Sequence, residues 1–345
     1  MYIFTKYRKY LPIGKKTPII SLNECNTPLI RSRVFKEHNV FYKFEGMNPT
    51  GSFKDRGMCL TISKAVEDGS LGVICASTGN TSASAAAYSS RAGLKCTVII
   101  PHNSIAMGKL AQSMIAGAKV LAVKGNFDTA LKIVKEITEN YNVTLVNSLN
   151  PYRIEGQKTA SFEVCDVLKN APDFLFIPVG NAGNITAYWK GFNEYYSSGK
   201  ITKLPKMMGF QAEGSAPIVN NRIIEDPKTI ATAIKIGNPA AWKQAVKARD
   251  DSGGIIESVS DEQIAKASLF LAQNEGIFAE PGSASCVAGL FKTIEKGYFR
   301  KKNQIIVCVL TGHGLKDPEF AISNSPKVDI IEPDKNLIAK KMDLI

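Results

Sequence analysis

Short apolar runs alternate with helical patterns along most of this chain, and this alternation limits the folds that it can adopt. Runs typical of strands lie at Gly72–Ala76, Leu94–Pro101, Lys119–Val123, Val143–Val146, Phe174–Val179, Met207–Gln211 and Gln304–Leu310. Patterns typical of helices lie at Ile105–Ala116, Phe127–Tyr141, Ile154–Leu168, Asp261–Asn274 and Ser283–Glu295. Strands that alternate with helices favour mainly parallel sheets with covered faces. We therefore predict an α/β protein, and its 345 residues leave room for two domains.

Polar, glycine-bearing turns follow three of the predicted strands. They are Ser77–Thr81, Gly180–Asn184 and Thr311–Gly314. In an open parallel sheet, the turns at the carboxyl ends of the strands share one edge and meet at a crevice. One such turn is unremarkable, but three in one chain predict a binding site.

A fourth turn, Asn48–Gly57, carries a lysine, Lys54, just before a helical pattern that begins at about Asp55. A lysine held there can point into a cleft and lose part of its hydration. Desolvation and neighbouring cations disfavour the ammonium form, so the side chain becomes a neutral amine that can attack a carbonyl or remove a proton. The alternative is a solvated lysine at the start of a helix.

Composition and charge narrow the class of protein. No apolar run is long enough to span a bilayer, and the first ten residues lack the apolar core of a signal peptide, so we expect a cytoplasmic protein. The formal net charge is +12. The basic residues are dispersed, without the interleaved aromatic stripe that binds single strands, so we expect a basic surface and no nucleic-acid partner.

The seven cysteines are widely spaced, and no Cys-x-x-Cys pair is present. Several lie inside apolar runs, which is typical of buried, reduced thiols. Only three histidines could help to bind a metal, and we predict no metal site.

The four turns occur in the order seen in pyridoxal-phosphate enzymes of fold type II, and within that group the chain resembles the threonine synthases in their shorter form. The resemblance runs from about Tyr7 to Pro318. Further segments that carry it are Asn26–Leu29, Gly108–Gln112, Asn150–Thr159 and Glu280–Ala284. The chain departs from the family pattern at Cys25, where glycine is common, and at Gly282, where alanine is common.

This resemblance implies a fold, a cofactor and an assembly. The fold would consist of two doubly wound domains with mainly parallel sheets, similar to the tryptophan synthase β subunit. Residues 46–150 would form a small mobile domain, and residues 1–45 plus 151–345 a large one. The cofactor would be pyridoxal 5'-phosphate, and the family is expected to form a homodimer.

The resemblance also assigns residues to the cofactor. Lys54 would bind its aldehyde and act as the catalytic base. Asn80 would bind the ring hydroxyl, and the hydroxyl of Thr311 would face the pyridine nitrogen. The phosphate would lie on the turn that precedes the helix pattern near Ile185, at Gly180, Asn181, Ala182, Gly183 and Asn184. Small residues there expose backbone N–H groups and the positive end of a helix dipole, which favours an anion.

For the substrate, the resemblance implies O-phosphohomoserine. Ser77, Thr78 and Thr81 would bind its carboxylate, although Ser77 and Thr78 could instead serve as N-caps. Its phosphate would be bound by Thr81, Ser148, Arg153 and Asn181. Arg153 is the strongest candidate because a guanidinium makes forked, charge-assisted contacts; the alternative is an ion pair with Glu155 or Glu163.

Some roles stay open. His313 could be an acid or base, or could serve the hydrogen bonds of its own loop, and Lys109 is expected to be structural. The implied reaction is the conversion of O-phosphohomoserine and water to L-threonine and phosphate. The alternatives are a threonine or serine dehydratase, and a non-catalytic protein that binds the cofactor.

Overall fold

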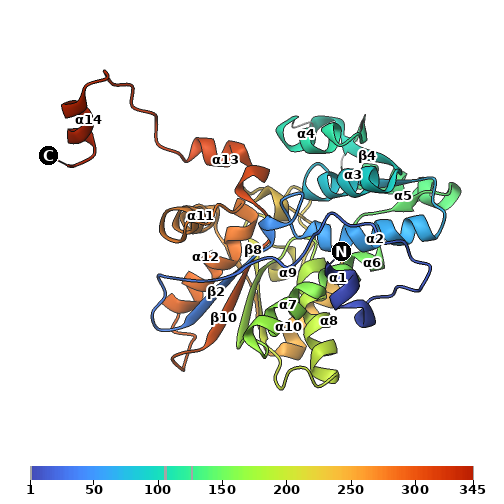
Figure 1. Cartoon of the computed structure of the whole chain (residues 1–345), viewed down its shortest axis with the longest axis horizontal. Helices are drawn as coiled ribbons and strands as arrows, with labels where there is room; N and C mark the ends of the chain where they lie inside the picture. The colour runs from blue at the N-terminus through green and yellow to red at the C-terminus, as the bar shows by residue number, and fades with distance from the viewer. Residues whose placement is uncertain (1, 105–106, 126, 345) are drawn as a thin grey trace.

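A computed structural model describes residues 2–104, 107–125 and 127–344, and its strands form two sheets (Figure 1). The six-stranded sheet has the order β1-β2-β10-β7-β8-β9 and the four-stranded sheet the order β5-β4-β3-β6. The larger sheet contains β1 (Leu29–Arg31), β2 (Asn39–Phe44), β7 (Phe174–Pro178), β8 (Lys206–Ala212), β9 (Ile255–Val259) and β10 (Ile305–Leu310). The smaller contains β3 (Gly72–Ala76), β4 (Lys95–Pro101), β5 (Lys119–Val123) and β6 (Thr144–Leu145). The strand pairings are parallel apart from β1 with β2, so the expected α/β fold with mainly parallel sheets is confirmed.

Helices cover both faces of each sheet. The smaller sheet lies between α3 (Asn80–Ala92) and α5 (Phe127–Asn140), with α2 (Lys54–Glu67) and α4 (Met107–Ile115) alongside. Helices α8 (Gly183–Ser197), α10 (Trp242–Ser252) and α12 (Pro281–Glu295) pack on the larger sheet. Helix α11 (Asp261–Glu275) packs on α12, and α6 (Pro151–Gln157) and α7 (Thr159–Leu168) pack on α8. Short helices complete the chain at α1 (Tyr2–Lys6), α9 (Pro217–Asn220), α13 (Pro318–Ser323) and α14 (Lys335–Lys341).

Strand β7 shows why these sheets need two covered faces. Its residues are all buried, and they alternate between two cores. Leu175 and Ile177 pack with α8 and α10, whereas Phe174 and Phe176 pack with α11 and α12. A strand buried on both faces has a continuous apolar run, which is the pattern that made it recognisable in the sequence.

Strands β1, β2 and β9 were not predicted. Strand β2 contains a lysine, Lys43, which is 1% exposed. Its Nζ lies 2.6 Å from a carboxylate oxygen of Glu163, a residue of α7. A buried charge requires a partner of opposite charge. The partner of Lys43 is 120 residues away in the chain, so the sequence pattern alone does not reveal it.

The predicted single helix Ile154–Leu168 was wrong. The structure has two helices, α6 and α7, and the first begins at Pro151 with the side chain of Asn150 as its N-cap. They are separated at Lys158, whose carbonyl accepts a hydrogen bond from the Ser161 hydroxyl at 2.7 Å. Helix α8 approaches so closely there that a Cβ on Gly191 would lie 2.5 Å from this carbonyl. The other predicted helices are present within a few residues, although Ile105 lies outside the described residues.

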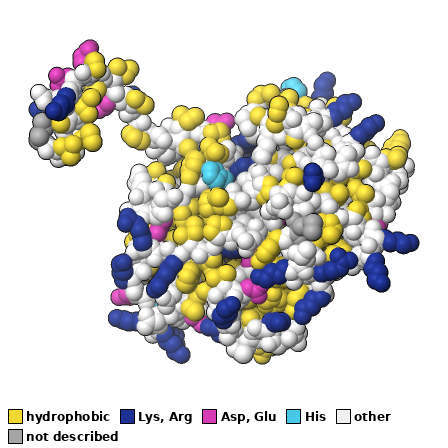
Figure 2. Space-filling view, in the orientation of Figure 1, with side chains coloured by type: hydrophobic (Ala, Val, Ile, Leu, Met, Phe, Trp, Pro, Cys, Tyr) yellow, Lys and Arg dark blue, Asp and Glu magenta, His cyan; other side chains and the backbone are white. Residues whose placement is uncertain are grey.

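The C-terminal segment extends away from the two sheets. Figure 1 shows α14 separated from the rest of the molecule, and the described residues after Ser323 are exposed or partly exposed. Lysine and arginine side chains are scattered over the face shown in Figure 2 rather than gathered in one patch. Among the described residues, no helix is both long and apolar enough to cross a membrane.

Helix α2 is held against α6 by two glycines. A Cβ on Gly156 of α6 would lie 1.9 Å from the carbonyl oxygen of Arg56, and a Cβ on Gly57 would lie 2.7 Å from the carbonyl oxygen of Arg153. Both distances are shorter than real Cβ contacts. The two helix backbones are therefore in direct contact, and this contact sets the distance between Lys54 and Arg153.

We expect Gly156→Ala to lower the free energy of unfolding by about 3 kcal/mol, because the added methyl group must separate two packed helices. Urea-induced unfolding would measure the loss. Gly14→Ala is the matched control, since Gly14 is exposed and its surroundings are open, and it should change stability by less than about 0.5 kcal/mol. Equal stability of the two variants would contradict this account of the helix contact.

Candidate active site

The Gly180–Asn184 and Thr311–Gly314 turns lie at one edge of the larger sheet, whereas Ser77–Thr81 follows β3 of the smaller sheet, so the predicted turns do not share one sheet edge. Strands β10 and β7 are neighbours, so Thr311 and the Gly180–Asn184 turn lie side by side at their carboxyl ends. The backbone N–H of Phe53 donates to the carbonyl of Thr311 at 3.0 Å, which places Lys54 beside the same turn. The side chain of Asn181 donates to the hydroxyl of Ser148.

Lys54 is the first residue of α2 and is partly exposed. Burial of its amine and, to a smaller extent, the positive charge of Arg153 together lower the pKa of Lys54 to about 7, and the carboxyl group of Glu280 opposes this shift. Its Nζ lies 4.4 Å from the centre of the Phe53 ring. Near neutral pH, Lys54 is therefore a neutral, nucleophilic amine in a large fraction of the protein molecules.

The Gly180–Asn184 turn leads into α8, which begins at Gly183 rather than near Ile185. Ala182 has a φ of 64°, a conformation that L-residues rarely adopt. A Cβ on Gly183 would meet no atom within 4 Å, so the space beside this first residue of the helix is open. The side chain of Asn184 is buried, and neither of its polar atoms has a hydrogen-bond partner within the described residues.

Asn80 follows β3 of the smaller sheet, and Thr311 follows β10 of the larger sheet. Asn80 is the first residue of α3, and its Nδ2 donates to both carboxylate oxygens of Glu280, each at 3.1 Å. Thr311 is 4% exposed, and its hydroxyl lies 3.0 Å from the hydroxyl of Ser283. Both side chains are therefore held by partners from α12 or the residue before it.

Arg153 is a buried cation with unused donors. It is 1% exposed, and its Nη1 donates to the carbonyl of Val146 at 2.8 Å. Its Nε and Nη2 are buried without a hydrogen-bond partner in the part of the chain that the structure describes. Burial lowers the pKa of Arg153 to about 10. Unpaired guanidinium donors of this kind favour binding of an anion.

The alternative ion pairs for Arg153 are wrong. The carboxylate of Glu163 binds Arg56 and Lys43, and that of Glu155 binds Lys158 and Lys190. No carboxylate lies within ion-pair distance of Arg153 among the described residues.

Ser77, Thr78 and Thr81 lie in or beside the turn that precedes α3. Gly79, not Ser77 or Thr78, is the N-cap of α3, so the N-cap reading of those two residues is wrong. The hydroxyl of Ser77 accepts a hydrogen bond from the backbone of Gly79 at 3.3 Å, and Thr78 and Thr81 are partly exposed beside it.

His313 and Lys109 have structural contacts. His313 Nδ1 accepts a hydrogen bond from the backbone N–H of Leu315 at 3.2 Å, as expected for a histidine that serves its own loop. The Lys109 amine donates to Thr232 at 2.9 Å and lies 3.3 Å from the carboxylate of Asp317. It thereby ties α4 to the loops beyond the larger sheet.

Sequence analysis missed Glu280 and Ser283 as members of this site. Both lie in the Glu280–Ala284 segment, which carries the family resemblance but has no distinctive pattern of its own. Their contacts with Asn80 and Thr311 join residues that are 200 and 28 positions apart. The family resemblance of Glu280–Ala284 was therefore the only feature of the sequence that could have indicated these two residues.

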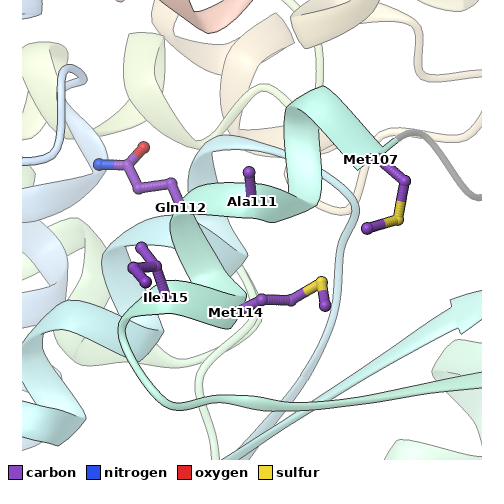
Figure 3. Close-up of a pocket in the computed structure, with 5 residues that line it drawn as sticks. All are labelled: Met107, Ala111, Gln112, Met114 and Ile115. Carbon is purple, nitrogen blue, oxygen red and sulfur yellow. The ribbon is translucent and has the colours of Figure 1, made fainter.

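A separate apolar hollow lies on α4, lined by Met107, Ala111, Gln112, Met114 and Ile115 (Figure 3). It contains no ionisable side chain and none of the residues assigned above. In the described part of the chain, no group of three or more histidine, cysteine or acidic side chains is arranged to hold a metal ion.

The chain belongs to the family described as pyridoxal-phosphate dependent enzymes, whose model matches residues 20–312. Solved structures agree on the fold: maize serine racemase superposes with a TM-score of 0.75 at 21% identity, over 88% of this chain and 93% of that one. The processed threonine deaminase isoform 2 of Solanum lycopersicum gives 0.74 at 21% identity, over 88% and 89%. At this identity the likeness shows the fold alone.

Within that family, the chain belongs to the threonine synthases. The threonine synthase of Halalkalibacterium halodurans is 59% identical over 93% of this chain and 91% of its own length. That of Methanocaldococcus jannaschii is 50% identical over 97% and 86%, and that of Mycobacterium tuberculosis is 48% identical over 99% and 96%.

We expect covalent attachment of pyridoxal phosphate to follow the protonation of Lys54. As the pH falls through about 7, the amine gains a proton and stops reacting, so the attachment rate should rise up to that pH and then level off. An ordinary lysine would keep gaining reactivity to about pH 10. Stopped-flow absorbance with cofactor-free protein measures the rate.

Lys54→Arg should abolish the covalent chromophore. Lys64→Arg, on the same helix but ion-paired with Glu67, should leave the profile unchanged. A rate that still climbs tenfold per pH unit at pH 9 would show that Lys54 is not perturbed.

Proposed function

We propose that this protein converts O-phospho-L-homoserine and water to L-threonine and phosphate with bound pyridoxal phosphate. The observation that carries the proposal is the pairing of two groups in one crevice: a lysine with a lowered pKa, Lys54, and a buried arginine with unpaired donors, Arg153. The lysine suits the amino-acid end of this substrate and the arginine suits its phosphate. The relatives' names support the same reaction.

The described residues fit the cofactor. The open N-terminus of α8 at Gly183, with the unpartnered side chain of Asn184, would hold its phosphate together with Gly180, Asn181 and Ala182. Asn80 would bind the ring hydroxyl and Thr311 the ring nitrogen. A neutral hydroxyl does not force that nitrogen to be protonated, as a carboxylate would. Bound pyridoxal phosphate supplies the electron sink for ionisation of the substrate's C–H bonds.

Lys54 has the proton-transfer role. With the cofactor and the substrate bound, the free amine of Lys54 would take the proton from Cα. A base would then take a proton from Cβ, and the Cγ–O bond would break with its electron pair leaving on the phosphate oxygen. Water then adds its hydroxyl at Cβ, and protons return to the carbon chain, so that threonine and one phosphate are formed.

The leaving phosphate is bound by Arg153, Ser148, Asn181 and Thr81 in this proposal. Arg153 has two unused donors, and the Ser148–Asn181 hydrogen bond joins the two turns from which these side chains come. Ser77, Thr78 and Thr81, at the start of α3, hold the substrate's carboxylate near the N-terminus of that helix.

The division into a small mobile domain, residues 46–150, and a large domain, residues 1–45 plus 151–345, belongs to this proposal. The four-stranded sheet lies wholly within the first segment, which supports the division. Closure of the small domain would exclude water from the early steps. We further propose a homodimer, as the family resemblance implies, and a cytoplasmic location.

The decisive assay gives the cofactor-loaded protein O-phosphohomoserine, with L-threonine and L-serine in parallel. We expect phosphate and threonine in a one-to-one ratio. An oxo acid formed from threonine or serine, without phosphate release, would assign the dehydratase reaction instead.

Replacing Arg153 by lysine should reduce kcat/KM for O-phosphohomoserine by about 30-fold, because lysine keeps the charge but loses the forked donors. Phosphate release measures this loss, and the affinity for the cofactor should change little. Arg91→Lys, at an exposed position on α3, is the control and should match the parent protein. An unchanged kcat/KM in Arg153→Lys would show that Arg153 does not bind the substrate.

A further inference from the structure

Glu280 is a buried carboxyl group that the proposed mechanism does not use. It directly precedes α12 and is 4% exposed. Both of its oxygens accept from one atom, Nδ2 of Asn80, at 3.1 Å. Asn80 belongs to the segment of the smaller sheet and Glu280 to that of the larger sheet, so this contact joins the two segments.

The turn after β10 leaves the Glu280 side chain little freedom. The backbone N–H of Glu280 donates to the carbonyl of Gly312 at 3.1 Å. A Cβ on Gly312 would lie 2.3 Å from one carboxylate oxygen, so glycine at this position leaves the room that the carboxylate occupies. The hydroxyl of Ser283 accepts from the N–H of Gly312 at 2.8 Å and fixes the same turn. The carboxylate therefore has a defined position relative to Thr311.

An ionised carboxylate only accepts hydrogen bonds, whereas an asparagine amide has a donor end and an acceptor end. Glu280 must therefore face the nitrogen of Asn80, and its two oxygens set which way the amide points. Without that constraint, the amide could turn over and exchange its two ends. The orientation matters because Asn80 is the residue assigned to the cofactor's ring hydroxyl.

We propose that Glu280 is a positioning residue whose carboxylate holds the Asn80 amide in one orientation, so that an Asn80 N–H is presented to the ring hydroxyl of the cofactor. This inference rests on the proposed function. It concerns the binding of the cofactor and makes no use of the identity of the amino-acid substrate.

The charges around Glu280 determine the pH at which this can be tested. Burial raises the pKa of Glu280 to about 7; the hydrogen bond from Asn80 and the positive charges of Lys316 and Lys54 oppose the increase, and Asp317 adds to it. The imidazole of His313 lies on the adjoining loop, which pairs with the residue before Glu280. At pH 8.5 the carboxyl group is ionised and accepts from Asn80.

The test measures the equilibrium affinity for pyridoxal phosphate at pH 8.5, by absorbance titration of cofactor-free protein. Glu280→Gln keeps the shape but loses one acceptor oxygen, and we expect the affinity to fall by about 10-fold. Glu280→Asp keeps the charge but withdraws it from Asn80, and should lose as much. Glu257→Gln, at a partly exposed carboxylate on β9, is the control and should bind as the parent does.

A double-mutant cycle with Asn80→Ala separates positioning from general electrostatics. If Glu280 acts through Asn80, Glu280→Gln should change the affinity by less than about twofold once Asn80 is alanine. A tenfold loss in that background, or parent-like affinity of Glu280→Asp, would overturn the proposal, since a charge acting on Lys54 would then suffice. Failure to make threonine would refute the proposed function and leave this binding result intact.

Discussion

The buried guanidinium of Arg56 is the interaction on which the arrangement of the site depends. It is fully buried, and it binds the carboxylates of Glu45 and Glu163, the latter through Nη1 and Nη2 at 2.7 Å each. Lys43 binds the Glu163 carboxylate oxygen that Arg56 Nη2 also contacts. Since an unpaired buried charge costs several kcal/mol, the members of this network are held together once the chain folds. Strand β2, helix α2 and helix α7 meet there.

That network explains how Lys54 can have a low pKa in a rigid position. Lys54 lies two residues before Arg56, so its place on α2 is set by the ion pairs and by the contact with α6. The same contact brings Arg153 close enough to lower the pKa of Lys54. Arg56 is therefore paired with carboxylates, whereas Lys54 and Arg153 form no ion pair among the described residues. The unpaired two are the groups to which we assign the chemistry.

Much of the fold could be predicted because β3, β4 and β7 are buried on both faces and have apolar runs of the right length. The polar turns at the ends of such strands were the basis for predicting where the site lies. Strand β2 could not be predicted, because Lys43 interrupts its apolar pattern and its partner lies on α7. The left-handed backbone at Cys25 was only weakly indicated by the sequence. Its φ of 77° lies in the region that favours glycine, which is the residue common at this position in the family.

The sequence by itself determined the fold class, because the alternation of apolar runs and helical patterns carries that information, and it predicted Lys54 and Arg153 as site residues from their chemistry and the family resemblance. The tertiary structure alone decided which charges are paired. Glu163 was an open partner for Arg153 in the sequence, yet it binds Arg56 and Lys43 in the fold. Glu280 had no assigned role in the sequence, and its contact with Asn80 is visible only in the fold. Pairing depends on distances between residues far apart in the chain, and those distances exist only after the helices and sheets have packed.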